Sequence, residues 1–493
     1  MVFLHKQMYK IEDEERKVSI VEAVPRITSY QFCQLVSWEI RCKQQWAVVG
    51  ANGAGKSTLI NILTNKYALK SGKVTYYDDE REEQHEFIKT VAFSDIYTLT
   101  DTKNVFYQQR WNVGLMQTGP IVRSLFPQDA DSQWLSFLVN TFDVGHLLDK
   151  DIKLLSSGEL RKILIIKSLI NKPHILVLDN PYIGLDAPSR LVINNLFDDI
   201  LKASDLQLIL VLSNPADIPP FITHIMPVCN KEMTAPLQYN EFMQNDKWQQ
   251  ILFPVVDNYQ FNFPKQALAG NSNYDIAIKM RQVQIRYGER TILDKLDWEV
   301  KKGEKWALLG RNGSGKSTLL SLVMGDNPQA YANDITLFDR KRGSGESIWD
   351  IKKRIGYVAS EMHLYYLENI LCLHIVASGF FDTIGLHRKN YSEQEAPALQ
   401  WMRIFNIEHL KAIPFLSVST GEQRLVLLAR AFAKNPELLI LDEPLHGLDK
   451  ANKKRIKQLI EQFCDHSKTL IYVSHYEEEI PDVVNNRLVL EYK

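Results

Sequence analysis

The pattern of hydrophobic and polar positions follows one plan twice along the chain. In each half a short apolar run meets a glycine-rich turn and then continues as a helical apolar pattern, at Trp38–Leu63 and again at Trp298–Val323. Setting Trp298 against Trp38 aligns the two stretches at a separation of 260 residues. An internal repeat of this kind predicts duplication of one supersecondary plan.

Further apolar segments follow in the same order in both halves. The elements expected in the first half are a helix within Lys153–Ile170 and strands at Ile175–Asp179 and Leu206–Asn214, and their counterparts are Val418–Phe432, Leu438–Pro444 and Ile471–His475. Short, wholly apolar strands that alternate with helices indicate a parallel sheet buried on both faces. We therefore expect an α/β fold.

The repeat also suggests where the domains end. We expect a first domain at residues 1–230, a connector at residues 231–274 and a second domain at residues 275–493. The connector holds several aromatics and prolines, and it reads neither as a heptad helix nor as a highly charged arm. No role could be assigned to Tyr107–Asn112, which lacks clear periodicity.

Composition narrows the class of protein. Of the 493 residues, 45% are hydrophobic and 24% are charged, which is the balance of a soluble globular protein, and the net charge of −1 gives no overall footprint for nucleic acid or anionic lipid. The five cysteines form no C-x-x-C pair, which indicates buried thiols in a reducing compartment. Because no apolar run approaches the roughly 18 to 20 residues of a spanning helix, a membrane role would require a separate permease.

The two glycine-rich turns carry the strongest chemical signal. Both have the G-x-x-x-x-G-K-[ST] spacing of a phosphate-binding loop, in which glycines let backbone N–H groups point at phosphate oxygens and the following helix adds its dipole. The predicted nucleotide-binding residues are Gly50, Asn52, Gly53, Gly55, Lys56, Ser57 and Thr58 in the first loop, and Gly310, Asn312, Gly313, Gly315, Lys316, Ser317 and Thr318 in the second.

Two more motifs accompany each loop. A helix start of the type S-x-G-E, able to receive phosphate, occurs at Ser156, Gly158 and Glu159 and at Ser419, Gly421 and Glu422. A buried strand then ends in an acid, Asp179 or Asp442, where a carboxylate near the phosphate loop would hold Mg²⁺ partly through water. The expected metal set is Ser57, Asp179, Ser317 and Asp442.

Together with the G-L-D turns and a strand that ends in His475, these motifs resemble the nucleotide-binding domain of ABC ATPases, in tandem over nearly the whole chain. Ile335–Ser360 is similar to the second domain of the ModF/PhrA-like group of soluble tandem ABC proteins, a group labelled as molybdate-transport or photorepair proteins. The resemblance implies two P-loop NTPase domains, each with a mixed sheet core and a helical subdomain. It also implies ATP and Mg²⁺ as cofactors.

The resemblance assigns roles in the second half. Tyr287 would stack on adenine, Lys316 would bind phosphate, Glu443 would polarise the attacking water and His475 would contact the γ-phosphate. The two halves would face each other head to tail as an intramolecular dimer, so that the S-x-G-E start of one half covers the nucleotide of the other. The expected catalytic residues are Glu443, His475 and Lys316.

The first half differs at the catalytic positions. Asn180 stands where the second half has Glu443, and Asn214 where it has His475. An amide cannot accept a proton as a carboxylate does, and general-base help is worth about 10²- to 10⁴-fold in rate. We expect the first site to bind nucleotide and hydrolyse it slowly or not at all, although another residue could supply the base. No aromatic residue of the first half aligns with Tyr287, because Ile27 falls at that position, with Tyr30 nearby.

The sequence leaves the biological role open between two hypotheses. One is the cytosolic ATPase subunit of a transporter, molybdate-type by resemblance, in the cytoplasm or peripherally on the cytoplasmic face of a membrane. The other is a soluble ABC ATPase acting on ribosome, nucleic acid or a protein partner. ABC transport domains carry a glutamine directly after one of their strands. At the matching position this chain has Ser360 in the second half and Asp95–Ile96 in the first half, so the glutamine is absent. The basic run Asp339–Glu346 favours a solvated turn over a nucleic-acid contact.

Overall fold

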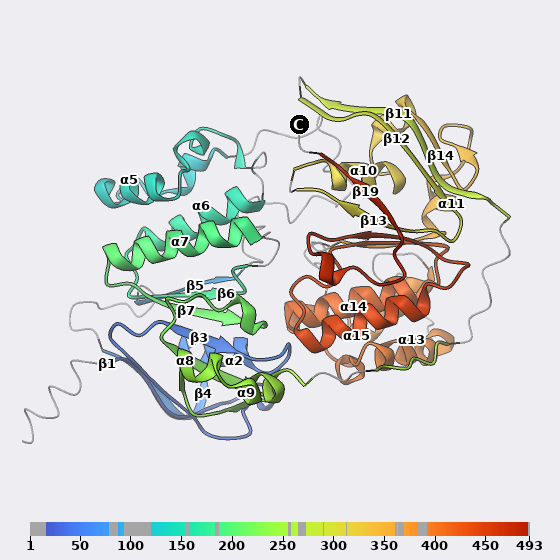
Figure 1. The fold of residues 1–493 in the computed structure, drawn as a ribbon. Coiled ribbons are helices and arrows are strands. Elements are labelled where there is room, and N and C mark those ends of the chain that lie inside the picture. Colours follow the sequence, from blue (N-terminus) through green and yellow to red (C-terminus); the bar gives the residue numbers. More distant parts are fainter. Residues whose placement is uncertain are drawn as a thin grey trace, which may run out of the picture. The chain divides into compact units, whose positions relative to one another are not determined.

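The computed structural model describes residues 16–77, 87–92, 120–152, 155, 157–182, 187–254, 258–264, 273–288, 290–311, 313–359, 362, 369–381 and 392–491. These residues form two compact units. The N unit contains the described residues from 16 to 254 together with Gly447–Lys450. The C unit contains those from 258 to 446 and from 451 to 491. Figure 1 shows the elements of each unit.

The main sheet of the N unit has the strand order β10-β8-β3-β7-β6-β5. All neighbours in it are parallel except β10, which runs antiparallel to β8. Its strands are β3 (Trp46–Val49), β5 (Ile88–Ala92), β6 (Ile175–Asp179), β7 (Gln207–Leu212), β8 (His224–Cys229) and β10 (Leu237–Gln238), with β9 (Glu232–Met233) paired to β8. A separate antiparallel sheet joins β2 (Val36–Arg41), β1 (Arg16–Pro25) and β4 (Leu69–Tyr76).

Both faces of the main sheet of the N unit are buried. Alternate residues of β6 and β7 pack in opposite directions: Val177 and Val211 face a core shared with the antiparallel sheet, whereas Leu178 and Leu210 face a core shared with helices. This double burial explains why the sequence shows continuous apolar runs there and no alternation.

Helices follow the strands of the N unit. They are α2 (Lys56–Leu63), α5 (Ser132–Thr141), α6 (Ser157–Leu169), α7 (Ala187–Ala203), α8 (Tyr239–Met243) and α9 (Asp246–Leu252). Helices α6 and α7 run beside each other next to strands β5, β6 and β7 (Figure 1). Buried residues of β10, α8 and α9, which belong to the expected connector, pack into the helix-side core of the N unit.

The C unit repeats this plan. Its parallel sheet has the order β16-β17-β18-β13-β19 and its antiparallel sheet the order β12-β11-β14-β15. The strands are β11 (Ile276–Tyr287), β12 (Arg290–Lys301), β13 (Lys305–Leu309), β14 (Asp334–Leu337), β15 (Arg340–Lys341), β16 (Ile355–Ala359), β17 (Leu438–Asp442), β18 (Thr469–Val473) and β19 (Asn486–Val489). The helices are α10 (Lys316–Val323), α11 (Ile348–Lys352), α12 (Cys372–Ser378), α13 (Ser392–Ile404), α14 (Thr420–Ala433) and α15 (Lys450–Phe463).

Strands β16, β17, β18, β13 and β19 of the C unit match β5, β6, β7, β3 and β8 of the N unit in order and direction. The predicted α/β fold of two tandem units with mixed sheets is confirmed.

An extended segment of the expected connector, residues 258–264, lies on the C unit. Its ring side chains form a ladder, with Tyr259 stacked on Phe261 at 6.0 Å and Phe261 on Phe263 at 6.3 Å between ring centroids. Phe263 packs against Trp401 of α13 and against Phe463 of α15. The main chain is also held, because the Gln462 side chain accepts from the Phe261 N–H and donates to the Tyr259 carbonyl. We call residues 258–264 the aromatic strap.

The basic run Asp339–Glu346 is only partly the solvated turn expected from its sequence. Arg342 is buried, and its guanidinium pairs with Glu346 at 2.8 Å, with the two side chains 0% and 2% exposed. Glu346 also accepts from the N–H groups of Gly343 and Ser344. The expectation differs from the structure because the ion pair between Arg342 and Glu346 lies inside the turn and is buried, while the other residues of the run remain exposed. Tyr107–Asn112 lies outside the described residues.

Candidate nucleotide-binding and catalytic sites

Each phosphate loop follows a strand of the parallel sheet of its unit, β3 or β13, and ends where a helix begins. Helices α2 and α10 start at Lys56 and Lys316, directly after Gly55 and Gly315, which have φ angles of 107° and 97°. Such left-handed backbone favours glycine. A side chain at Gly50 would place its Cβ 2.0 Å from the Val228 carbonyl oxygen, so only glycine fits at this position of the first loop.

The two loop lysines adopt the same position. The ammonium group of Lys56 donates to the carbonyls of Gly50 and Ala51 at 2.8 and 2.7 Å, and that of Lys316 donates to the corresponding carbonyls of its own loop at 2.6 and 3.0 Å. Both lysines are 7% exposed. A buried cation held over a glycine turn at a helix N-terminus is suited to phosphate.

The remaining predicted loop residues lie where the helices start. Ser57 and Ser317 are exposed at the first turn, while Thr58 is half-buried and Thr318 is buried. Gly53 and Gly313 have positive φ angles of 75° and 82°. Asn312 lies outside the described residues.

The oxygen donors expected for Mg²⁺ meet in the N unit. Ser57 Oγ donates to Asp179 Oδ2 at 3.2 Å, and Asp179 is the last residue of β6. In the C unit, Ser317 is the second residue of the corresponding helix and Asp442 ends the corresponding strand. A hydroxyl beside a carboxylate is a ligand set that Mg²⁺ accepts, so these residues fit the ion.

The residue after the strand-terminal aspartate, Asp179 or Asp442, which is called the Walker B aspartate, has the same backbone in both units. Glu443 has a φ of 51° and its N–H donates to the Val473 carbonyl at 3.0 Å. Asn180 has a φ of 52° and its N–H donates to the Val211 carbonyl at 2.9 Å. The difference between the units at this point therefore lies in the side chains.

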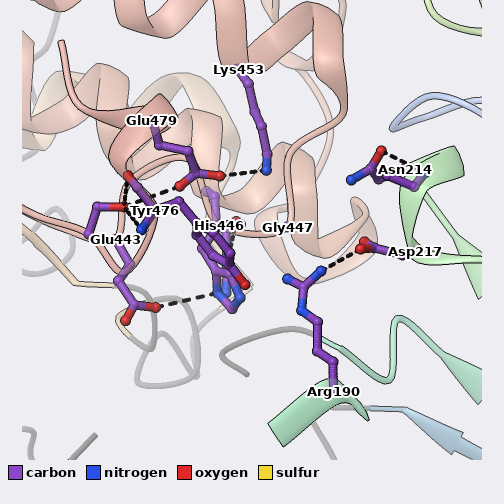
Figure 2. A network of polar contacts seen from close by, with 12 residues as sticks. Arg190, Asn214, Asp217, Glu443, His446, Gly447, Lys453, Tyr476 and Glu479 are labelled. Atoms are coloured by element: carbon purple, nitrogen blue, oxygen red, sulfur yellow. Dashed lines mark hydrogen bonds and ion pairs between the residues drawn. The ribbon is translucent and has the colours of Figure 1, made fainter. Parts of the chain in front are cut away.

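In the C unit the Glu443 carboxylate faces imidazoles (Figure 2). His475 Nε2 lies 2.7 Å from Glu443 Oε1, and His446 Nδ1 lies 3.8 Å from Glu443 Oε2. Burial by itself would raise the pKa of Glu443, but the contact with His475 and the nearby cationic groups outweigh it and hold the pKa below its ordinary value. The carboxylate is therefore ionised, as a general base must be.

In the N unit the corresponding amides make other contacts. Asn180 Nδ2 donates to Asp179 Oδ1 at 2.8 Å. Asn214 caps the short 3-10 turn Pro215–Asp217, because its side-chain oxygen accepts from the Ala216 N–H at 3.2 Å. Figure 2 shows Asn214 with this contact and Asp217 paired with Arg190. Neither amide can accept a proton as the carboxylate and imidazole at these positions of the C unit can.

The predicted S-x-G-E motifs begin helices in both units. Ser419 and Glu422 form a capping box at the start of α14, with the Ser419 N–H donating to Glu422 Oε2 at 2.9 Å and the Glu422 N–H donating to Ser419 Oγ at 3.4 Å. Gly421 is buried in the first turn. Gly158 and Glu159 lie in the first turn of α6, and Ser156 lies outside the described residues.

The candidate adenine positions differ between the units. Tyr287 ends β11, and its hydroxyl accepts from Asn327 Nδ2 at 2.9 Å. In the N unit Ile27 is 57% exposed, while Tyr30 stacks on Tyr67 with ring centroids 4.4 Å apart. The sequence pointed to Tyr30 but gave no sign of its partner, because Tyr67 follows the phosphate loop and not the strand before it.

Asn52 of the first phosphate loop contacts the part of the N unit that comes from late in the sequence. Its N–H donates to Asp449 Oδ2 at 2.9 Å, and its side-chain amide donates to the Gly447 carbonyl at 3.2 Å. Gly447–Asp449 is the G-L-D turn that follows the second Walker B strand.

The sequence model of the family described as "ABC transporter" matches residues 33–183 and 293–446. The chain belongs to the ABC transporter family. It is 35% identical over 488 residues to the ABC transporter ATP-binding protein ModF of Escherichia coli (strain K12), with 96% of each chain covered. This confirms the predicted likeness to ModF-type tandem proteins. An uncharacterized ABC transporter ATP-binding protein of Schizosaccharomyces pombe is 28% identical over 473 residues, with 92% and 93% covered.

Among solved structures, the archaeal ribosome recycling factor aABCE1 superposes with a TM-score of 0.52 at 17% identity, covering 95% of this chain and 87% of that one. This likeness concerns the fold. As a member of the ABC family the chain is an ATP-binding protein and an ATPase. Within the described residues, every helix is too short or too polar to cross a membrane.

Proposed function

We propose that this ABC protein hydrolyses ATP mainly in its C unit and uses its N unit chiefly to bind ATP. The observation that carries the proposal is the contrast around one backbone position. Glu443 is an ionised carboxylate in contact with His475, whereas Asn180 donates to Asp179 and Asn214 caps a turn. The phosphate loops themselves are alike in both units, which supports nucleotide binding by both.

The proposed chemistry in the C unit is an attack of water on the γ-phosphate. Glu443 accepts a proton from the water, His475 orients the γ-phosphate, and Lys316 with the loop N–H groups holds the phosphate chain. Ser317 and Asp442 would hold Mg²⁺, whose charge offsets that of the phosphates. Glu443 already lies within 2.7 Å of His475, so the base and the phosphate-binding imidazole are neighbours before substrate arrives.

Each nucleotide is proposed to be covered by the S-x-G-E helix start of the other half. Ser419, Gly421 and Glu422 would complete the first site, and Ser156, Gly158 and Glu159 the second. The match of both halves to the ABC family supports this proposal. ATP would then stabilise the closed arrangement and hydrolysis would release it.

We further propose that the chain powers a transporter as its ATP-binding component, with a separate permease. The name of the E. coli relative, an ABC transporter ATP-binding protein, supports this role. The resemblance to the ModF-like group makes molybdate the first substrate to test. The site of action would be the cytoplasm or the cytoplasmic face of the membrane.

The catalytic part is tested with Glu443→Gln. We expect steady-state ATP hydrolysis to fall by about 10²- to 10⁴-fold, as loss of a general base does, while binding of a fluorescent ATP analogue persists. Glu478→Gln is the matched control, because it makes the same glutamate-to-glutamine change at an exposed residue of a short turn. Unchanged turnover in Glu443→Gln would refute the assignment.

The transport part is tested by affinity capture of the Glu443→Gln protein in the presence of ATP. Recovery of a membrane permease would support the proposal. Recovery of ribosomes or nucleic acid in its place would favour a soluble ATPase that is not coupled to transport.

A further inference from the structure

A second histidine faces the Glu443 carboxylate and has no part in the mechanism described above. His446 lies three residues after Glu443 and is 7% exposed. Its Nδ1 lies 3.8 Å from Glu443 Oε2, while His475 Nε2 lies 2.7 Å from the other oxygen, Oε1. Each oxygen of the carboxylate therefore has an imidazole beside it.

The backbone of His446 is fixed on two sides. Its N–H donates to the Glu443 carbonyl at 3.2 Å, which closes a tight turn between the two residues. Its carbonyl accepts from the guanidinium of Arg424, a buried residue of α14. The backbone of His446 is thereby joined to α14, the helix that begins at the S-x-G-E motif of the C unit.

The internal repeat shows which residues change with the catalytic base. Aligning LDNPYIGLD with LDEPLHGLD keeps the Walker B aspartate, the proline and the G-L-D turn in both halves. Three positions differ within this stretch: Asn180 stands in place of Glu443, Tyr182 in place of Leu445 and Ile183 in place of His446. After the next strand, Asn214 stands in place of His475. The half that lacks the carboxylate thus lacks both imidazoles, although its sequence keeps the proline and the G-L-D residues around them.

A carboxylate held from one side only can rotate about its terminal bonds, and an error of about 1 Å in the position of a catalytic group can cost about 10²-fold in rate. The proposed contact of His475 with the γ-phosphate would engage Nε2, the same nitrogen that lies at Glu443 here. His446 is then the imidazole that remains beside the carboxylate.

From this geometry we propose that His446 is a positioning residue, which holds Glu443 in the orientation needed to accept a proton from water. The inference rests on the proposed function of Glu443. It predicts that His446 acts through Glu443 and contributes to turnover without contributing to ATP binding.

Three variants test the proposal. The amide nitrogen of Asn falls near the position of a histidine Nδ1, whereas that of Gln falls near Nε2, so His446→Asn and His446→Gln separate the two ring nitrogens. We expect His446→Leu and His446→Gln to lower kcat by about 10- to 100-fold with KM and ATP-analogue affinity within about twofold of the parent. His446→Asn should retain about a third or more of the parent kcat.

The second measurement is the same substitution in a Glu443→Gln background, followed as single-turnover phosphate release. If His446 acts through Glu443, His446→Gln should cause no further loss there. A parental kcat in both His446→Leu and His446→Gln, an equal loss in His446→Asn and His446→Gln, or an additive loss in the Glu443→Gln background would overturn the inference. Parental turnover in Glu443→Gln alone would instead refute the proposed function.

Discussion

The half that carries Asn180 and Asn214 can be used to rebuild the proposed catalytic arrangement. We consider the N-unit substitutions Asn180→Glu and Asn214→His in a Glu443→Gln protein, where the C unit is silenced. Asn180 already has the backbone of Glu443, with φ angles of 52° and 51° and an N–H donated to the neighbouring strand in both cases. A glutamate should therefore fit at position 180 without new backbone strain.

The size of the effect follows from the contacts. A general base contributes about 10²- to 10⁴-fold, equivalent to about 3 to 5 kcal/mol of barrier. Asn180→Glu alone would lack the imidazole that lies 2.7 Å from the carboxylate in the C unit, because Asn214 is used to cap a turn. We expect less than tenfold from Asn180→Glu and at least a further tenfold when Asn214→His is added. Loss of the cap costs about 1 kcal/mol of stability, which is small beside the roughly 5 to 15 kcal/mol of a typical native protein.

The assay is single-turnover release of phosphate from γ-labelled ATP with the enzyme in excess. Lys56→Ala in the rebuilt protein is the control, since it should abolish the regained rate by removing the phosphate-binding cation of the N unit. An absence of any gain in the rebuilt protein, with ATP binding intact, would show that side chains at these two positions do not explain the asymmetry. A full gain from Asn180→Glu alone would show that His475 is not needed to hold the base.

Two further outcomes are expected. Glu346→Gln should destabilise the protein at pH 7 by about 3 to 5 kcal/mol, because it leaves the buried Arg342 guanidinium unpaired. The pKa of Glu346 is lowered by N–H donors of its turn and by Arg342 against the effect of burial, so this stability is present above the unfolded pKa and is lost as pH falls through the folded one. Urea unfolding should show the two proteins converging below about pH 4, and a constant difference would contradict the ion pair. Iodoacetamide at pH 8 should label exposed Cys33 in the native protein but not Cys464, since burial raises the pKa of Cys464 to about 12, and equal labelling by mass spectrometry would contradict that burial.

Much of the fold could be predicted from sequence because its causes are local. The repeat at Trp38 and Trp298, the apolar strands ending at Asp179 and Asp442, and the glycine-rich turns each follow from neighbours in the chain. Strand β6 runs from Ile175 to Asp179 as predicted. The roles of the individual site residues remain predictions, as do the expected domain boundaries.

What the sequence did not reveal depends on residues brought together by folding. His446 looks like an ordinary loop residue until Glu443 is seen beside it, although a comparison with Ile183 would have marked it as a difference between the halves. Arg342 reads as part of a basic surface run because its partner Glu346 lies within the same polar stretch. Charge counted along a sequence does not separate an exposed cation from one neutralised by its own turn.

The aromatic strap affects how the two halves could be produced separately. Phe263 covers Trp401 and Phe463, and the main chain beside it is bonded to Gln462. A C-terminal fragment that starts at residue 275 would expose these rings to solvent, and the resulting hydrophobic patch would favour aggregation. A fragment that starts just before Asn258 keeps them shielded, so the best place to cut lies upstream of the border that the repeat suggests.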